Sequence, residues 1–367
     1  MNLKREEQQL TLEGKTYSIQ AICQLIATAS EAPSPFVQEL YLFLEDWFNP
    51  SPYITVQTSG STGTPKQLTV LKKQMIQSAR LTCDFLHLKP GDAALLCMPL
   101  QYIAGKMMVV RALVAGLNLI VRTPSGHPLA DIHFPLKFAA MVPLQVYNSL
   151  QILEEKECLS QIELLIIGGG AIDAALEREI SQLPNIVYST YGMTETLSHI
   201  ALRRLNGIEA SSHYQPFSSV KLSLSPDNTL VIDAPLVCNK QLATNDVAEI
   251  FGDGTFTIVG RKDNIINTGG IKVQAEEVEK TLRSVISVAF AITSVPDRRL
   301  GEAIVLLMEN VPDLETIKEQ IDHLLPKYQR PKHLYMVDCV PLTGSGKIDR
   351  AACRLLVQKQ NNKDSLS

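Results

Sequence analysis

The segment Thr58-Ser-Gly-Ser-Thr-Gly-Thr-Pro-Lys66 carries more information about the fold than any other part of this sequence. Its glycines allow the backbone to turn its N–H groups toward an anion, its hydroxyl groups add donors, and its lysine adds a positive charge. Such a segment suits a polyphosphate. It is not a Walker A segment, because Pro65 precedes the lysine and Gln67 follows it. A flexible Ser/Thr/Gly linker is the alternative, although a linker seldom lies between an apolar strand and an amphipathic helix.

The composition is that of a globular protein. The chain has 367 residues, 45% of them hydrophobic and 20% charged, which is enough for two or three domains. A net charge of −4 offers no basic excess to a nucleic acid. No apolar run is long enough to span a bilayer, and the N-terminus shows no signal peptide. The seven cysteines form no C-x-x-C pair, which favours reduced thiols. We expect a cytoplasmic protein with no nucleic-acid partner and no integral membrane segment.

Short apolar runs alternate with helical patterns between about residues 54 and 258. The runs indicate strands buried on both faces, and between them apolar residues recur every three or four positions, as on one helix face. This alternation predicts a large layered α/β domain. The expected strands are residues 93–98, 117–121, 138–142, 164–167 and 186–188, and the expected helices are 75–86, 106–115 and 174–183.

The pattern changes near Gly260, where a polar turn precedes a segment typical of a small α+β domain. We expect a helix over 274–285, strands over 287–293 and 303–308 with a turn at Pro296 and Asp297 between them, and a helix over 314–325. The segment Thr343-Gly-Ser-Gly-Lys-Ile-Asp-Arg350 is expected to be neither helix nor central strand, because of its glycines.

The phosphate segment resembles the signature of the adenylate-forming enzymes, which include acyl- and aryl-CoA ligases, luciferases and the adenylation domains of peptide synthetases. Further stretches match that family in order, so the resemblance covers about residues 54 to 350. It implies a large AMP-binding domain over residues 1–260 and a small mobile lid domain over 261–367. It also implies ATP, Mg²⁺ and coenzyme A. About 57 residues precede the phosphate segment, so we expect an N-terminal part that is shortened relative to typical members.

The resemblance assigns roles to a set of nucleotide-binding residues. In Tyr191-Gly-Met-Thr-Glu-Thr196, Tyr191 would flank adenine, Thr194 would contact phosphate and Glu195 would hold the metal. Asp246 would accept from the ribose hydroxyls, although a lone Asp is ordinarily a turn residue. The full set is Thr58, Ser59, Gly60, Ser61, Thr62, Gly63, Thr64, Lys66, Gly169, Gly170, Tyr191, Gly192, Asp246 and Arg261.

The same resemblance implies two half-reactions. Lys347 would stabilise charge while the oxygen of the acid attacks the α-phosphate of ATP, with Thr194 and Glu195 as the other catalytic residues. Rotation at the hinge residue Asp263 would then withdraw Lys347 and admit the thiol. Three residues of the small domain would face coenzyme A at that stage, namely Gly269, Gly270 and Lys272.

The acid is indicated by sequence around residues 101–111 and 194–199, which most resembles the 2-succinylbenzoate–CoA ligases of menaquinone biosynthesis. That substrate has two carboxylates, so one must be held while the other reacts. The candidates for the acyl site are Gly168, Tyr102 (where the family often has His), Lys106, Arg111, Ser198 and His199. The alternatives are that Lys106 and Arg111 form the solvent-exposed face of a helix, that His199 is a polar residue satisfied within the protein, and that Gly168 to Gly170 are only a tight turn.

Other functions stay open at this point. The chain could be a ligase for another aryl or short acyl acid, an adenylating enzyme that loads a carrier-protein thiol, or a non-catalytic relative that binds nucleotide. Nothing in the sequence separates free coenzyme A from a carrier arm. A homodimer is left open as well.

Overall fold

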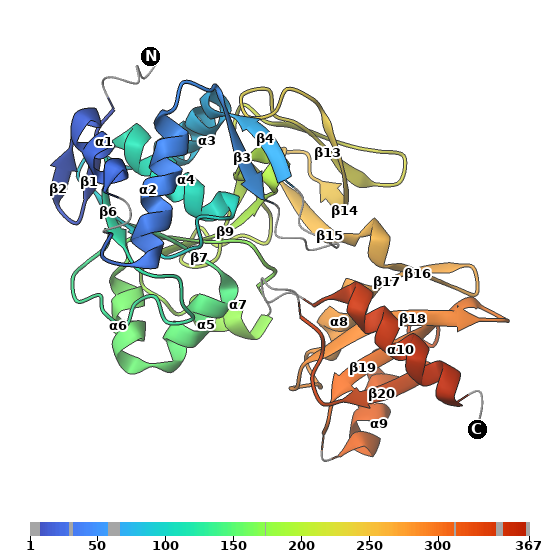
Figure 1. Cartoon of the computed structure of the whole chain (residues 1–367). Coiled ribbons are helices and arrows are strands. Elements are labelled where there is room, and N and C mark those ends of the chain that lie inside the picture. The colour runs from blue at the N-terminus through green and yellow to red at the C-terminus, as the bar shows by residue number, and fades with distance from the viewer. Residues whose placement is uncertain are drawn as a thin grey trace. The chain divides into compact units, whose positions relative to one another are not determined.

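The computed structural model describes residues 8–28, 32–57, 67–172, 174–311, 313–342 and 348–364, and the chain divides into two compact units (Figure 1). Among the described residues, unit 1 comprises 8–28, 32–57, 67–172, 174–221 and 233–241, and unit 2 comprises 222–232, 242–311, 313–342 and 348–364. Among the described helices, none is both long and apolar enough to cross a membrane. The predicted boundary after residue 260 stays a prediction.

Unit 1 is built on one sheet, in which β6, β5, β7, β8 and β9 are parallel neighbours. The sheet order is β11-β10-β9-β8-β7-β5-β6-β1-β2. These five parallel strands are the five predicted from apolar runs, so the expected α/β class is confirmed. The strands are β1 (Leu10–Leu12), β2 (Lys15–Tyr17), β5 (Ala93–Leu96), β6 (Asn118–Val121), β7 (Phe138–Met141), β8 (Leu164–Ile167), β9 (Ile186–Gly192), β10 (His199–Arg204) and β11 (Gln215–Pro216).

Helices cover both faces of this sheet, with the helices that precede β6 on one side and those that follow β7 on the other (Figure 1). Layers of this kind bury strands on both faces, which explains their continuous apolar sequences. The helices are α1 (Ile19–Ala27), α2 (Pro35–Phe48), α3 (Lys72–Phe85), α4 (Ile103–Ala115), α5 (Pro143–Gln151), α6 (Leu153–Gln161) and α7 (Ala174–Ile180), with a short 3₁₀ turn η3 (Thr194–Thr196).

The part of the chain before the phosphate segment forms β1, β2, α1, α2 and β3 (Tyr53–Gln57), and β3 pairs with β4 (Gln67–Leu71), which follows the segment. Ser34 caps α2 and Pro35 occupies its first turn, both favourable at that end of a helix. Gln57 pairs directly with Gln67, so the described flanks of the phosphate segment are adjacent strand ends. The segment itself, Thr58 to Lys66, lies outside the described residues.

Unit 2 begins with a separate antiparallel sheet, in the order β12-β13-β14-β15. Asp246 on one strand lies directly opposite Arg261 on the next. The strands of this sheet are mostly half-buried or exposed along their length, so no continuous apolar run marks them in the sequence. They are β12 (Lys221–Leu224), β13 (Thr229–Asp233), β14 (Leu242–Ile250) and β15 (Phe256–Arg261), followed by the 3₁₀ turn η4 (Lys262–Asn264).

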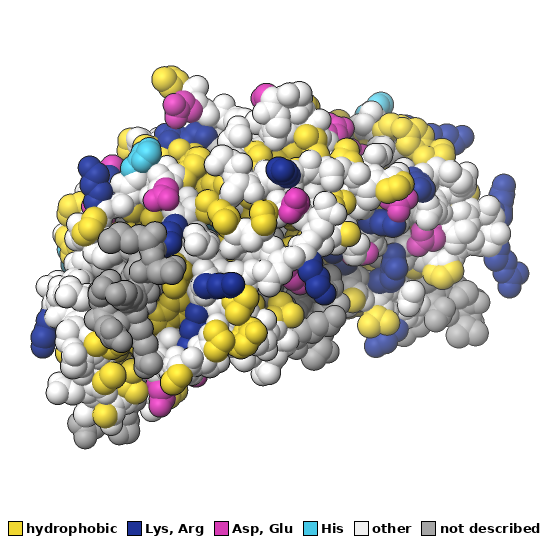
Figure 2. Space-filling model, turned by 90° about the horizontal axis from the view of Figure 1, so that it is seen from above, with side chains coloured by type: hydrophobic (Ala, Val, Ile, Leu, Met, Phe, Trp, Pro, Cys, Tyr) yellow, Lys and Arg dark blue, Asp and Glu magenta, His cyan; other side chains and the backbone are white. Residues whose placement is uncertain are grey.

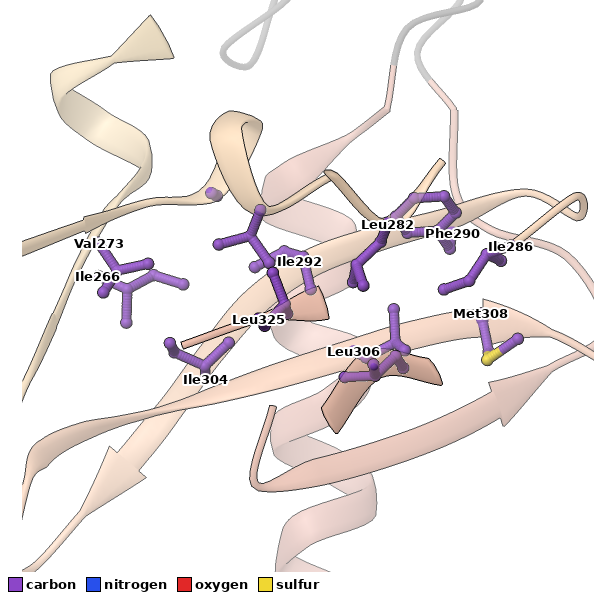
Figure 3. Packing of buried hydrophobic residues seen from close by; sticks show 13 residues of the cluster. Ile266, Val273, Leu282, Ile286, Phe290, Ile292, Ile304, Leu306, Met308 and Leu325 are labelled. Atoms are coloured by element: carbon purple, nitrogen blue, oxygen red, sulfur yellow. The ribbon is translucent and has the colours of Figure 1, made fainter. Parts of the chain in front are cut away.

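The remainder of unit 2 is the expected α+β arrangement. Helix α8 packs on β18 and β19, where Leu282 and Ile286 lie toward Phe290, Leu306 and Met308 (Figure 3). The predicted helices and both strands are confirmed, with bounds that differ by a few residues. The elements are β16 (Ile265–Thr268), β17 (Ile271–Gln274), α8 (Ala275–Leu282), β18 (Phe290–Asp297), β19 (Gly301–Glu309), α9 (Leu314–Leu324), β20 (His333–Val337) and α10 (Arg350–Asp364).

Two local predictions were wrong. Pro296 and Asp297 are not the turn but the last paired residues of β18; the Asp297 carboxylate accepts from the backbone N–H groups of Arg299 and Leu300, which places the turn after the strand. Arg350 is not in a loop but begins α10, because Asp349 accepts from the N–H of Ala352 at the start of that helix.

Candidate active site

Two glycine segments follow neighbouring parallel strands of unit 1. Gly168 follows β8, and a Cβ atom there would lie 2.3 Å from Oγ1 of Thr190 on β9. Gly169 has φ +79°, a backbone conformation that favours glycine. Gly170, the third residue of the run, is half-buried. The run is thus a tight turn that also brings backbone close to the end of β9, and the carboxyl ends of adjacent parallel strands are where open α/β sheets bind ligands.

The Tyr191-Gly192 pair ends β9 at the same edge. A Cβ atom at Gly192 would lie 2.3 Å from the carbonyl oxygen of Ser198, so only glycine allows the following turn to fold back so closely. The ring of Tyr191 is half-buried and lies 5.9 Å from that of Tyr214, at a tilted angle. Contact of Tyr191 with adenine stays a prediction.

Glu195 lies in the 3₁₀ turn that follows. The hydroxyl of Thr196 accepts from the N–H of Met193 and lies 2.8 Å from the carbonyl oxygen of Ser198, which fixes the turn. The Glu195 side chain is exposed, as is expected of a group that meets a ligand, and Thr194 beside it is half-buried. No described group of three or more His, Cys, Asp or Glu could hold a metal ion. A single carboxylate still fits Mg²⁺, which commonly takes one or two carboxylates together with phosphate oxygens and water.

Tyr102 and Lys106 lie at the start of α4. Tyr102 forms an isolated parallel bridge with Gln57. The Nζ of Lys106 donates to the carbonyl oxygen of Thr55 at 3.0 Å and lies 5.5 Å from the ring centroid of Phe43. Burial lowers the pKa of Lys106, against the opposing charge of Asp46. Lys106 therefore ties α4 to β3, and its contact with the acid stays a prediction.

Arg111, further along α4, is fully buried, with 2% of its surface exposed. Its Nη2 donates to Oγ of Ser198 at 2.7 Å, and its Nη1 lies 3.7 Å from Sδ of Met108. The buried Nε has no hydrogen-bond partner, and no carboxylate in the described part of the chain forms an ion pair with the guanidinium. Burial lowers the pKa of Arg111 to about 10, so the group is still cationic at pH 7. The alternative of a solvent-exposed helix face is wrong for Arg111.

His199, the first residue of β10, is also buried, with 7% of its surface exposed. Its Nε2 lies 3.0 Å from Oγ1 of Thr82 on α3, and its Nδ1 lies 3.3 Å from Oγ of Ser198. Burial, with the nearby Arg111 charge, lowers the pKa of His199 well below its usual value. Arg111, Ser198 and His199 were predicted as acyl-site residues, and the structure brings them together. Thr82 was missed; its only sequence signal was its place on the apolar stripe of α3.

In unit 2 the structure brings together Asp246, Arg261 and Asp263. Arg261 donates from Nη1 to Oδ1 of Asp246 at 2.8 Å and from Nη2 to Oδ2 of Asp263 at 2.9 Å. Asn245, which the sequence did not single out, donates to both oxygens of Asp263. Burial lowers the pKa of Arg261, but the hydrogen bond with Asp263 and the charge of Asp246 outweigh it and raise that pKa. The predicted hinge carboxylate is therefore bonded to Arg261 and, through Arg261, linked to Asp246, and the sequence predicts that both residues bind the nucleotide.

Gly269 and Gly270 form the turn between β16 and β17, with φ +60° and +83°. Two consecutive residues in this region are typical of the tight hairpin turn that glycine favours. Lys272 follows on β17 and is exposed. These residues occupy a projecting hairpin, and contact with coenzyme A stays a prediction.

Lys347 lies outside the described residues, but both flanks of its segment are described. Leu342 and Ile348 form an antiparallel bridge, and the N–H of Asp349 donates to the carbonyl oxygen of Pro341 at 2.9 Å. Arg350 then makes a bidentate pair with the buried Glu279 of α8, at 2.9 and 2.8 Å. The chain on either side of the segment is thus fastened to itself and to the core of unit 2.

The buried His199 predicts a pH dependence of stability. Its folded-state pKa is lowered, whereas in the unfolded chain it is about 6.5. The contribution of the neutral His199 to the free energy of unfolding is therefore fully present above about pH 6.5. It is lost as the pH falls below that value, because the unfolded chain then binds a proton at His199. Between pH 7.5 and 5.5, the free energy of unfolding measured in urea should fall by about 1 kcal/mol more for the wild type than for His199→Gln. An equal fall in both proteins would contradict a neutral, buried His199.

Comparison with known proteins agrees with this arrangement. The AMP-binding enzyme family matches residues 21–235, more than half of the chain. The chain is 28% identical over 319 residues to the 2-succinylbenzoate–CoA ligase of Escherichia coli K12, covering 83% of this chain and 68% of that protein. It is 35% identical to an acyl-CoA synthetase (AMP-forming)/AMP-acid ligase II-like protein of Dyadobacter fermentans of known structure, with 90% and 96% of the two chains covered and a TM-score of 0.62.

The same fold occurs in the o-succinylbenzoate CoA synthetase of Bacillus subtilis, solved with its acyl-adenylate intermediate. The TM-score is 0.75 at 17% identity, with 96% of each chain covered. The fold, the glycine-lined strand ends and the matched residues all agree with the resemblance seen in the sequence. This chain belongs to the AMP-binding enzyme family.

Proposed function

We propose that this protein is an AMP-forming acyl-CoA ligase that activates 2-succinylbenzoate, a step of menaquinone biosynthesis. In the first half-reaction a carboxylate oxygen of the acid attacks the α-phosphate of ATP, giving the acyl-adenylate and pyrophosphate. In the second, the thiol of coenzyme A attacks the acyl carbon, releasing AMP and a proton. Membership of the AMP-binding family and the several relatives named 2-succinylbenzoate–CoA ligases support this chemistry.

The observation that carries the choice of acid is the buried guanidinium of Arg111. A buried cation without a carboxylate partner is costly, because its desolvation is not repaid by an ion pair. An acid with two carboxylates supplies the missing charge, since one carboxylate reacts while the other pairs with Arg111. The Nε and the remaining N–H groups of Arg111 are the donors for that pair.

The nucleotide is held, in this proposal, by the residues at the strand ends and by the phosphate segment. Tyr191 flanks adenine, Thr194 contacts phosphate, and Asp246 and Arg261 contact the ribose. Glu195 would hold Mg²⁺, which supplies charge neutralisation at the phosphates. The exposed carboxylate of Glu195 fits that ion.

The small domain, proposed as residues 261–367, acts twice. Lys347 stabilises the charge that develops on the α-phosphate oxygens, because cations aimed at developing charge lower the barrier. Rotation at Asp263 then exchanges Lys347 for the hairpin of Gly269, Gly270 and Lys272, which admits the thiol. The hydrogen bonds of Asp263 to Arg261 and Asn245 are the contacts that such a rotation must rearrange.

Three further expectations stay predictions from the sequence. They are the cytoplasmic location, the homodimer left open above, and the use of free coenzyme A in place of a carrier-protein thiol. All seven cysteines are free thiols in the structure.

A pyrophosphate-release screen over candidate acids tests the proposal. Release should be fastest with 2-succinylbenzoate, and acyl-CoA should accumulate only when coenzyme A is present. Benzoate and phenylacetate, which cannot pair with Arg111 while they react, should be poor substrates. Efficient release with these acids and none with 2-succinylbenzoate would overturn the choice of acid. No release with any acid would overturn the ligase function.

Lys347→Ala tests the two roles of the small domain. Adenylate formation should fall at least about a hundredfold, the usual effect of removing one group that stabilises transition-state charge. Thioester formation from supplied acyl-adenylate should stay close to the wild-type rate. Equal losses in both half-reactions would show that Lys347 does not act in adenylation alone.

A further inference from the structure

Arg111 is the first member of a row of buried side chains that crosses three elements of unit 1. The row runs from Arg111 on α4 through Ser198 and His199 at the start of β10 to Thr82 on α3. Thr82 is wholly buried, and its Oγ1 donates to the carbonyl oxygen of Ser78 at 3.3 Å. Each neighbouring pair of side chains in the row is within hydrogen-bond distance.

The hydrogen atoms that each group carries determine which group donates and which accepts in every hydrogen bond of the row. A guanidinium only donates, so Oγ of Ser198 accepts from Arg111 and has one proton left. The hydroxyl proton of Thr82 goes to Ser78, so Oγ1 of Thr82 must accept from His199. His199 therefore carries its proton on Nε2, and its Nδ1 accepts from Ser198. The two hydroxyl groups and the ring N–H of the row all have acceptors only when His199 is neutral in this tautomer.

These donor and acceptor assignments determine the orientation of Arg111. With Ser198 held as an acceptor toward Nη2, the guanidinium is oriented by one strong hydrogen bond, while Nε keeps no partner. A side chain with several rotatable bonds would otherwise lose orientation, and a misplaced donor weakens a bidentate pair. Both ring nitrogens of His199 are engaged within the row, which leaves neither for direct contact with the acid.

We propose that His199 and Thr82 are positioning residues that determine specificity, since they hold Ser198 and thereby orient Arg111 toward the second carboxylate of the acid. The inference rests on the proposed function, because it takes the partner of Arg111 to be that carboxylate. The sequence hypothesis was that His199 binds the acid directly. In this proposal His199 does not contact the acid but acts through Ser198 and Arg111.

Two substitutions of His199 distinguish the contributions of its two ring nitrogens. Asn at position 199 keeps an acceptor near the place of Nδ1, and Gln keeps a donor near the place of Nε2. The readout is KM for 2-succinylbenzoate compared with KM for its two monocarboxylate analogues, 4-oxo-4-phenylbutanoate and 2-butyrylbenzoate, measured by pyrophosphate release. A general loss of structure would change KM for all acids alike.

We expect His199→Gln to raise KM for 2-succinylbenzoate about tenfold, the effect of misplacing one charged hydrogen bond, and to leave KM for the better analogue unchanged. His199→Asn should stay close to the wild type, and Thr82→Val should act in the same direction as His199→Gln. The control is His87→Gln, which alters an exposed histidine just beyond the end of α3 and should change neither KM.

Arg111→Met and the wild type together distinguish failure of the inference from failure of the proposed function. If Arg111→Met removes the preference for the dicarboxylate and His199→Gln does not, the positioning role is wrong. If Arg111→Met also leaves the preference intact, Arg111 does not bind the second carboxylate and the positioning role is wrong. If the wild type itself shows no preference for the dicarboxylate, the proposed acid is wrong. Equal rises of KM for all acids in His199→Gln would likewise overturn the specificity role.

Discussion

The interior of unit 1 contains a positive charge, that of Arg111, which no carboxylate among the described residues neutralises. Arg111 is buried among apolar side chains of α4, donates one strong hydrogen bond to a neutral hydroxyl, and leaves its Nε without a partner. Removing a cation from water without an ion pair costs several kcal/mol even after relaxation. The surrounding structure maintains this group in one orientation through Ser198, His199 and Thr82. A group that is costly and yet well positioned is typical of a binding site, where stability is exchanged for function.

Three half-buried arginines contrast with Arg111. Arg350 pairs with Glu279 through both terminal nitrogens, Arg203 pairs with Glu177, and Arg261 pairs with two aspartates. Those pairs raise the pKa of each arginine above its ordinary value, whereas the pKa of Arg111 is lowered. The paired arginines fasten helices and strands to one another. Arg111 has no such partner among the described residues, which leaves its charge for a ligand.

Sequence reasoning succeeded where burial alone decides the structure. The strands at the centre of the large sheet are apolar on both faces, so continuous apolar segments of the sequence predict them. The buried residues of the α+β part were predicted in the same way (Figure 3). It failed for the sheet of β12 to β15, whose strands are mostly half-buried or exposed and so contain no continuous apolar run. On the face seen in Figure 2, acidic and basic side chains are interspersed with apolar ones, and such a surface carries little information about the fold.

The site was partly predictable for a related reason. The resemblance to the adenylate-forming enzymes identified Asp246, Arg261 and Asp263, which the structure brings together. The burial of Arg111 was left undecided. The decisive signal was present: α4 is apolar almost all round, and Lys106 and Arg111 are five residues apart, about 140° around a helix, so they cannot share one solvent-exposed face. Thr82 and Asn245 could not have been found, because their roles come from strands and helices distant in sequence.

Thermal unfolding of the wild type and of Arg111→Met, with and without 2-succinylbenzoate, tests the central claim most directly. A non-hydrolysable ATP analogue should be present throughout. If the Arg111 charge is kept for a ligand, Arg111→Met should unfold at the same or a higher temperature than the wild type without the acid, and the acid should raise the unfolding temperature of the wild type alone. A variant several degrees less stable without the acid, or an equal shift in both proteins, would contradict the account.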